Sequence, residues 1–236
     1  MSEIVLACLP FAGAGASFFR DWHALAPEGT RVLPIQLPGR EERFAEPLLT
    51  DVPQAVDEAH AQVTAALDAN SRVALFGHSL GAVLAYELAH RLRASGHDVV
   101  GLFVSGAPNP WNGRRDRATG LPDDEFAAQV QRFAGYAHPA LEDPEMRELM
   151  LPLLRADVEM HEHYEPASRA PLGVPVTSVR GRDDELVSEV EASQWSRATT
   201  ERFRFVHIDG EHMYLTDEAA TLLELIGGSL APAQGR

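Results

Sequence analysis

The chain has 236 residues, of which 45% are hydrophobic and 23% are charged, so it is long enough to bury a sizeable core as one domain. Its formal net charge is −15 and its sequence pI is about 5.0, which argues against nucleic acids and anionic membrane surfaces as partners. All 20 basic residues are arginine, which excludes mechanisms that need a lysine nucleophile or a Schiff base.

Apolar runs bounded by glycine, proline and polar residues predict strands that alternate with helices along the chain. The expected strands are residues 3–9, 31–36, 72–76, 99–105, 174–180 and 202–208. The expected helices are residues 17–26, 53–68, 79–95, 188–198 and 215–227. This alternation predicts an α/β fold with a doubly wound, mostly parallel sheet.

A loop of small residues follows the first strand, from Pro10 to Ser17. Such a loop lets backbone N–H groups approach a ligand closely, as in a dinucleotide-binding loop or in one half of an oxyanion hole. The dinucleotide pattern fails because Phe18 stands where its third glycine belongs and because the second strand, which ends at Gln36, lacks the ribose-binding acid. We therefore assign an oxyanion-binding N–H to Ala12.

The run Gly77 to Gly81 (Gly-His-Ser-Leu-Gly) lies between the third strand and the next helix. A G-x-S-x-G sequence in this position is typical of a nucleophile elbow, a strained turn that exposes the serine hydroxyl. The glycines are needed because a Cβ two residues from the serine would collide with the backbone. Ser79 is the candidate nucleophile, and the N–H of Leu80 is the second candidate donor to an oxyanion.

A long segment without a clear strand, residues 109–170, separates the fourth and fifth strands. It contains two amphipathic stretches, residues 123–133 and 144–164, and we expect it to form a helical lid over the active site. The alternative is that these helices simply pack on the core. The hydrolase core is then residues 1–108 and 171–230, and residues 231–236 are expected to be a disordered tail.

A serine nucleophile needs a base and an acid, and in α/β-hydrolases these follow it in the order acid, then histidine. The fifth strand runs into Asp183 and Asp184, and the sixth strand runs into His212. His212 is the candidate base, whereas position alone leaves both aspartates open as the acid. No H-E-x-x-H motif or Cys/His cluster is present, so we expect no metal, and catalysis by a serine, a histidine and an aspartate requires no cofactor.

With these residues in place, the chain resembles the type II thioesterases, which are free-standing α/β-hydrolases that accompany polyketide and nonribosomal peptide synthases. The resemblance rests on the segments Leu9–Gly13, Leu37–Arg43, Gly77–Gly81, Leu151–Asp157 and Gly210–Leu215. It implies that Asp184 is the acid, because Asp-Glu-Leu-Val fits the family's Asp-Pro-x-Val. Two departures, Ala14 and Glu211, each replace a family glycine, and Glu211 adds a carboxylate beside His212 that is expected to raise its pKa.

The resemblance implies hydrolysis of stalled or misprimed acyl groups from the phosphopantetheine thiol of acyl or peptidyl carrier proteins, which are transient partners. The alternatives are an esterase for free small molecules, an acyl-CoA thioesterase, and a ligand receptor on an inactive hydrolase fold. The single cysteine and the lack of a signal-peptide pattern predict a cytoplasmic location. Five arginines are the candidate contacts for an acidic carrier, and the alternative is that they only form a solvated surface or intramolecular ion pairs: Arg40, Arg43, Arg114, Arg115 and Arg117.

Overall fold

The protein folds around a six-stranded parallel sheet, as the alternating pattern predicts. The computed structural model describes residues 3–68, 70–112, 117–134, 141 and 143–231. The strands are β1 (Ile4–Leu9), β2 (Thr30–Pro34), β3 (Arg72–His78), β4 (Val99–Ser105), β5 (Val176–Gly181) and β6 (Phe203–Ile208). They are ordered β2-β1-β3-β4-β5-β6, and every neighbouring pair is parallel. The carboxyl ends of all six strands therefore meet at one edge of the sheet, where open α/β proteins place their chemistry.

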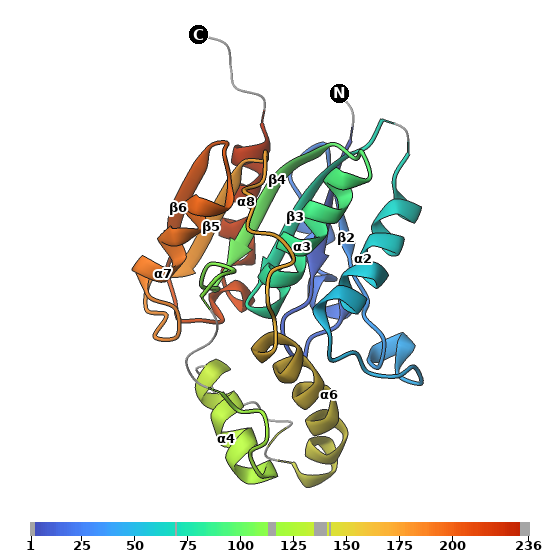
Figure 1. The fold of residues 1–236 in the computed structure, drawn as a ribbon, viewed down its shortest axis with the longest axis vertical. Coiled ribbons are helices and arrows are strands. Elements are labelled where there is room, and N and C mark those ends of the chain that lie inside the picture. The colour runs from blue at the N-terminus through green and yellow to red at the C-terminus, as the bar shows by residue number, and fades with distance from the viewer. Residues whose placement is uncertain (1–2, 69, 113–116, 135–140, 142, 232–236) are drawn as a thin grey trace.

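Helices cover both faces of this sheet (Figure 1). They are α1 (Trp22–Leu25), α2 (Val52–Ala66), α3 (Leu80–Ala94), α7 (Glu189–Ser193) and α8 (Ala219–Leu230). Two separate apolar clusters fill the spaces between the layers, one with α2 and α3 and the other with α1 and α8. Alternate residues of β1 serve the two clusters, because Ala7 packs in the first cluster and Cys8 in the second.

Three predicted helices are shorter or more broken than the sequence pattern suggests. Residues 17–26 form a 3-10 turn at Ala16–Phe19 and then the four-residue helix α1. Phe19 and Trp22 from these two short elements both pack against Phe76 on β3, with ring centroids 6.4 Å and 5.0 Å away. Similarly, 3-10 turns follow α7 (Gln194–Ala198) and precede α8 (Tyr214–Thr216).

In the described part of the segment between β4 and β5, residues Asp123–Ala134 form α4 and residues Pro144–Glu162 form α6, and both helices lie beyond the carboxyl ends of the strands (Figure 1). They share a small apolar cluster of their own, which includes Phe126 and Leu154. The end of α6 nevertheless reaches the main core through Met160, which is buried. The insertion is thus anchored at its C-terminal end.

Two further expectations can be compared with the described residues. The last helix continues to Leu230, and all but the first residue of the expected tail, 231–236, lies outside the described residues. In the described part of the chain, no helix combines the length and the apolar character needed to cross a membrane.

Candidate active site

Ser79 lies on a sharp turn between β3 and α3. Its backbone has φ 51° and ψ −115°, a conformation that side-chain-bearing residues rarely adopt and that functional sites can hold under strain. Glycines on either side make the turn possible. A Cβ on Gly77 would lie 1.9 Å from the carbonyl oxygen of Gly81, and a Cβ on Gly81 would lie 2.4 Å from that of Leu9. The Ser79 N–H donates to the carbonyl of Ser105 at 2.8 Å, which fixes the turn to β4.

The structure brings Asp184 and His212 together and leaves Asp183 apart. Asp184 is 2% exposed, and its Oδ2 accepts a hydrogen bond from His212 Nδ1 at 2.9 Å. Its Oδ1 accepts the N–H groups of Leu186 and Val187 at 2.8 Å and 3.1 Å. Asp183, by contrast, is exposed.

The surroundings of Asp184 keep its carboxylate ionised. Burial by itself raises the pKa of the Asp184 carboxyl. The hydrogen bond and charge of His212 and the two backbone N–H groups lower this pKa by more than burial raises it, so the pKa lies below its usual value. An ionised Asp184 holds the His212 proton on Nδ1 and leaves Nε2 as the acceptor. Glu211, the neighbour of His212 in the sequence, is exposed.

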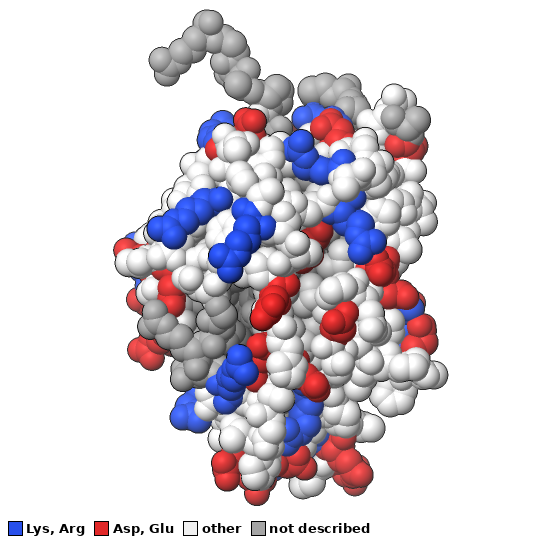
Figure 2. All heavy atoms as spheres, viewed as in Figure 1, with Lys and Arg blue, Asp and Glu red and all other residues white. Residues whose placement is uncertain are grey.

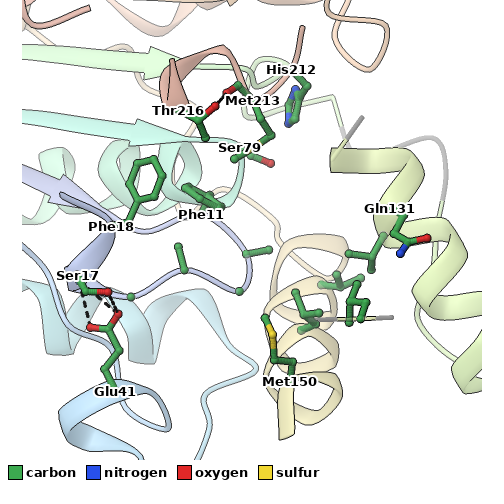
Figure 3. A pocket seen from close by; sticks show the side chains of 18 residues that line it. Phe11, Ser17, Phe18, Glu41, Ser79, Gln131, Met150, His212, Met213 and Thr216 are labelled. Atoms are coloured by element: carbon green, nitrogen blue, oxygen red, sulfur yellow. Dashed lines mark hydrogen bonds between the residues drawn. The ribbon is translucent and has the colours of Figure 1, made fainter. Parts of the chain in front are cut away.

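Ser79 and His212 line one cavity of about 350 Å³ (Figure 3). The loop that contains Ala12 forms another part of its wall, and α4 and α6 close it with apolar side chains such as Val130, Met150 and Leu154. The lining is therefore mostly apolar, and its polar side chains include Glu41 and Gln131 as well as Ser79 and His212. Such a cavity suits an acyl group whose carbonyl carbon lies next to Ser79.

Two backbone N–H groups near Ser79 are available to a ligand. Among the described residues, neither the N–H of Ala12 nor that of Leu80 has a hydrogen-bond acceptor. Leu80 is the first residue of α3, so its N–H also lies at the positive end of the helix dipole. Both N–H groups lie on segments that meet at the carboxyl edge of the sheet. Together they can donate hydrogen bonds to a negatively charged oxygen bound there.

A buried polar chain behind His212 could not be found in the sequence. His78 Nδ1 shares a hydrogen bond of 2.9 Å with Ser105 Oγ, which in turn lies 2.6 Å from the Tyr214 hydroxyl. The ring centroids of His78 and His212 are 4.7 Å apart. Burial lowers the pKa of His78 well below 6.5, so this ring is neutral at pH 7 and places no second charge beside His212. These residues come from three separate segments, and no local pattern links them.

The predicted carrier-contact arginines divide into buried, paired and exposed positions. Arg40 is 3% exposed and pairs with Asp157 at 2.8 Å, so its expected docking role is wrong. Arg43 pairs with Glu46 and Glu58. Arg117 is exposed, whereas Arg114 and Arg115 lie outside the described residues. On the described part of the face in Figure 2, acidic and basic side chains are mixed, without a large basic area.

The parallel sheet and the strained serine beside a carboxylate-bound histidine define a class of protein, the serine hydrolases with an α/β-hydrolase fold. In the described residues, no group of three His, Cys, Asp or Glu side chains is arranged to hold a metal ion. The chemistry of this class also needs none.

Within that class, the chain belongs to the thioesterase domain family, whose model matches residues 5–230. It is 33% identical over 228 residues to gramicidin S biosynthesis protein GrsT of Aneurinibacillus migulanus, covering 95% of this chain and 88% of that protein. It is 34% identical to thioesterase PikA5 of Streptomyces venezuelae, covering 99% and 83%. The solved structure of BorB, a type II thioesterase from the borrelidin biosynthetic cluster, superposes with a TM-score of 0.87 at 33% identity, covering 97% of this chain and 93% of that one. The protein is therefore a thioester hydrolase.

Proposed function

We propose that this thioesterase removes stalled or misprimed acyl groups from the phosphopantetheine thiol of carrier proteins in polyketide or nonribosomal peptide biosynthesis. The observation that carries the proposal is the cavity that Ser79 and His212 both line, in which His212 is hydrogen-bonded to the buried Asp184. Two relatives support a carrier-bound thioester as the substrate, since GrsT is named for gramicidin S biosynthesis and PikA5 is named as a thioesterase.

In the proposed reaction, Ser79 Oγ attacks the thioester carbonyl while His212 Nε2 takes its proton. The N–H groups of Ala12 and Leu80 hold the oxyanion that forms. The C–S bond then breaks, the thiol leaves with the proton from His212, and the acyl group remains on Ser79. Water, deprotonated by His212, then attacks the acyl-serine ester. The bond between the acyl carbon and Ser79 Oγ breaks, His212 returns the proton to Ser79 Oγ, and the free acid is released. Asp184 stabilises the His212 cation in both steps and remains ionised, which its lowered pKa favours.

The helices α4 and α6 act as a lid in this proposal. They close the cavity with apolar side chains and form a separate apolar cluster, so part of the insertion can move without disturbing the sheet. Pro152 lies inside α6, where it removes one helical hydrogen bond and provides a natural point of bending. The mobile part is then α4 with the first turns of α6, because the end of α6 is anchored in the core.

The proposal is tested by measuring kcat/KM for one set of acyl groups on carrier proteins, on coenzyme A and on a short pantetheine mimic. Carrier-bound thioesters should be hydrolysed with the highest kcat/KM. A strong preference for coenzyme A would instead assign the protein to metabolite thioesterases, and equal hydrolysis of simple oxygen esters would make it a general esterase. The Ser79→Ala variant should lose on the order of 10⁴-fold or more in kcat on every substrate. A variant that kept a tenth of the wild-type rate would contradict the role of Ser79.

A further inference from the structure

A buried ion pair connects two motifs that the proposed reaction does not use. Arg40 follows β2, and Asp157 lies on α6, 117 positions further along the chain. The guanidinium donates from Nη2 to Asp157 Oδ1 at 2.8 Å and from Nη1 to Oδ2 at 2.9 Å. The two side chains are 2% and 0% exposed. This is the bidentate geometry in which an arginine–carboxylate pair is strongest.

Both partners also bind the loop that carries Ala12. Asp157 Oδ2 accepts the N–H of Gly13 at 2.8 Å, and Arg40 Nη1 donates to the carbonyl of Ala14 at 2.9 Å. Gly13 has φ 81°, and a Cβ there would lie 2.6 Å from Leu154 on α6. The loop is therefore held from two sides by groups of opposite charge.

These contacts fix the backbone next to the proposed oxyanion donor. The Gly13 N–H belongs to the peptide group that begins at the carbonyl of Ala12, so its hydrogen bond to Asp157 sets the orientation of that peptide. The Ala14 N–H also donates to the carbonyl of Phe11 at 3.0 Å. This carbonyl belongs to the same peptide group as the Ala12 N–H, so the residues held by Arg40 and Asp157 and the proposed donor form one turn. A mere need for stability does not explain the pair, because apolar side chains of similar size are often as stabilising as a buried ion pair.

We propose that Arg40 and Asp157 are positioning residues that hold the front loop so that the N–H of Ala12 faces the developing oxyanion. This inference rests on the proposed function, since it assumes the donor role of Ala12. It also assigns a role to one residue in each of Leu37–Arg43 and Leu151–Asp157, two of the segments that carry the resemblance to type II thioesterases. Because Asp157 lies on α6, the same contacts keep this part of the insertion fixed while the rest moves.

The first test is Asp157→Asn. The new N–H₂ group would face an N–H of Arg40 in either orientation, and in one of them the N–H of Gly13 as well, so the pair that holds the loop should loosen. We expect kcat to fall about 10- to 100-fold with little change in KM, as for a misplaced oxyanion donor. An alkyl boronic acid, which forms a tetrahedral adduct with Ser79, should bind more weakly by a similar factor. A thioether analogue, which has no carbonyl to attack, should bind as well as it binds to the wild type.

Glu58→Gln is the matched control. Glu58 also pairs with an arginine of the same segment, Arg43, at 2.8 Å, but it is partly exposed and has no contact with the front loop. Its kcat should stay within twofold of the wild-type value. Equal losses in both variants would show that any lost charge near this segment is harmful, and would overturn the proposal.

A second variant keeps the proposal testable if Asp157→Asn, which leaves the buried charge of Arg40 unpaired, fails to fold. Arg40→Met combined with Asp157→Leu removes both charges but keeps similar volumes, so the chain should stay folded while kcat remains at least about tenfold reduced. A folded double variant with wild-type kcat, or failure of both variants to fold, would show that the pair serves only the fold. Failure of the proposed function itself would be seen separately, as activity that survives Ser79→Ala.

Discussion

Replacement of Asp184 by asparagine separates the two candidate acids and tests the base at the same time. Asp184 Oδ1 accepts two backbone N–H groups while Oδ2 accepts His212 Nδ1. If the new amide keeps its oxygen on the two backbone donors, its N–H₂ group points at His212 Nδ1. That nitrogen must then act as an acceptor, so the proton moves to Nε2. His212 in this tautomer cannot take the proton of Ser79.

The amide could also flip and restore the active tautomer, but the structure makes the flip costly. The N–H₂ group would then face the N–H groups of Leu186 and Val187, leaving two buried donors unpaired at about 1–3 kcal/mol each. The active form would be disfavoured by about 2–6 kcal/mol, which corresponds to about 30- to 2 × 10⁴-fold in rate. The upper end agrees with the loss of about 10⁴-fold typical of an Asp-to-Asn change in a serine triad.

The assay is single-turnover hydrolysis of an acyl-pantetheine substrate, so that acyl transfer to Ser79 is measured directly. Asp183→Asn is the control, because Asp183 is exposed and should lose less than about twofold. Thermal unfolding of both variants should show that they remain folded. A larger loss in Asp183→Asn than in Asp184→Asn would refute the assignment of the acid and the reasoning on tautomers.

Three further predictions follow from the elbow, the buried histidine and the insertion. Gly77→Ala should destabilise the protein by more than about 3 kcal/mol, because its Cβ would lie 1.9 Å from a backbone oxygen; a loss below about 1 kcal/mol in denaturant unfolding would contradict the elbow geometry. His78 has a lowered pKa in the folded state, so it stabilises the protein above about pH 6.5 and loses this contribution as the pH falls. The Tm should therefore decrease from about pH 8 to 5 less steeply in His78→Asn than in the wild type, and identical slopes would exclude His78 as a contributor. Backbone amides of α4 should exchange faster than those of β3 and slow when a phosphonate occupies Ser79, whereas equal and unchanged exchange would argue against a lid.

Local sequence determined the strands and the start of the elbow, because both depend largely on neighbours in the chain. The six apolar runs became six strands, each within a few residues of its predicted bounds. Gly77 could be interpreted directly, since the collision that it avoids is with Gly81, four positions away. The collision that Gly81 avoids is with the carbonyl of Leu9 on β1, which only the sheet brings close. The position of His212 after the last strand also followed from order along the chain, because parallel strands bring their carboxyl ends to one edge.

Tertiary structure decided what each charged side chain does. Asp183 and Asp184 are adjacent in sequence, yet only Asp184 turns inward to His212. Arg40 resembles a surface arginine in the sequence, but α6 brings Asp157 to it and buries both charges. The neighbours of His78 come from β4 and from the segment after β6. Burial and charge pairing depend on contacts between distant segments, so their electrostatic consequences arise only when the sheet and the insertion bring those segments together.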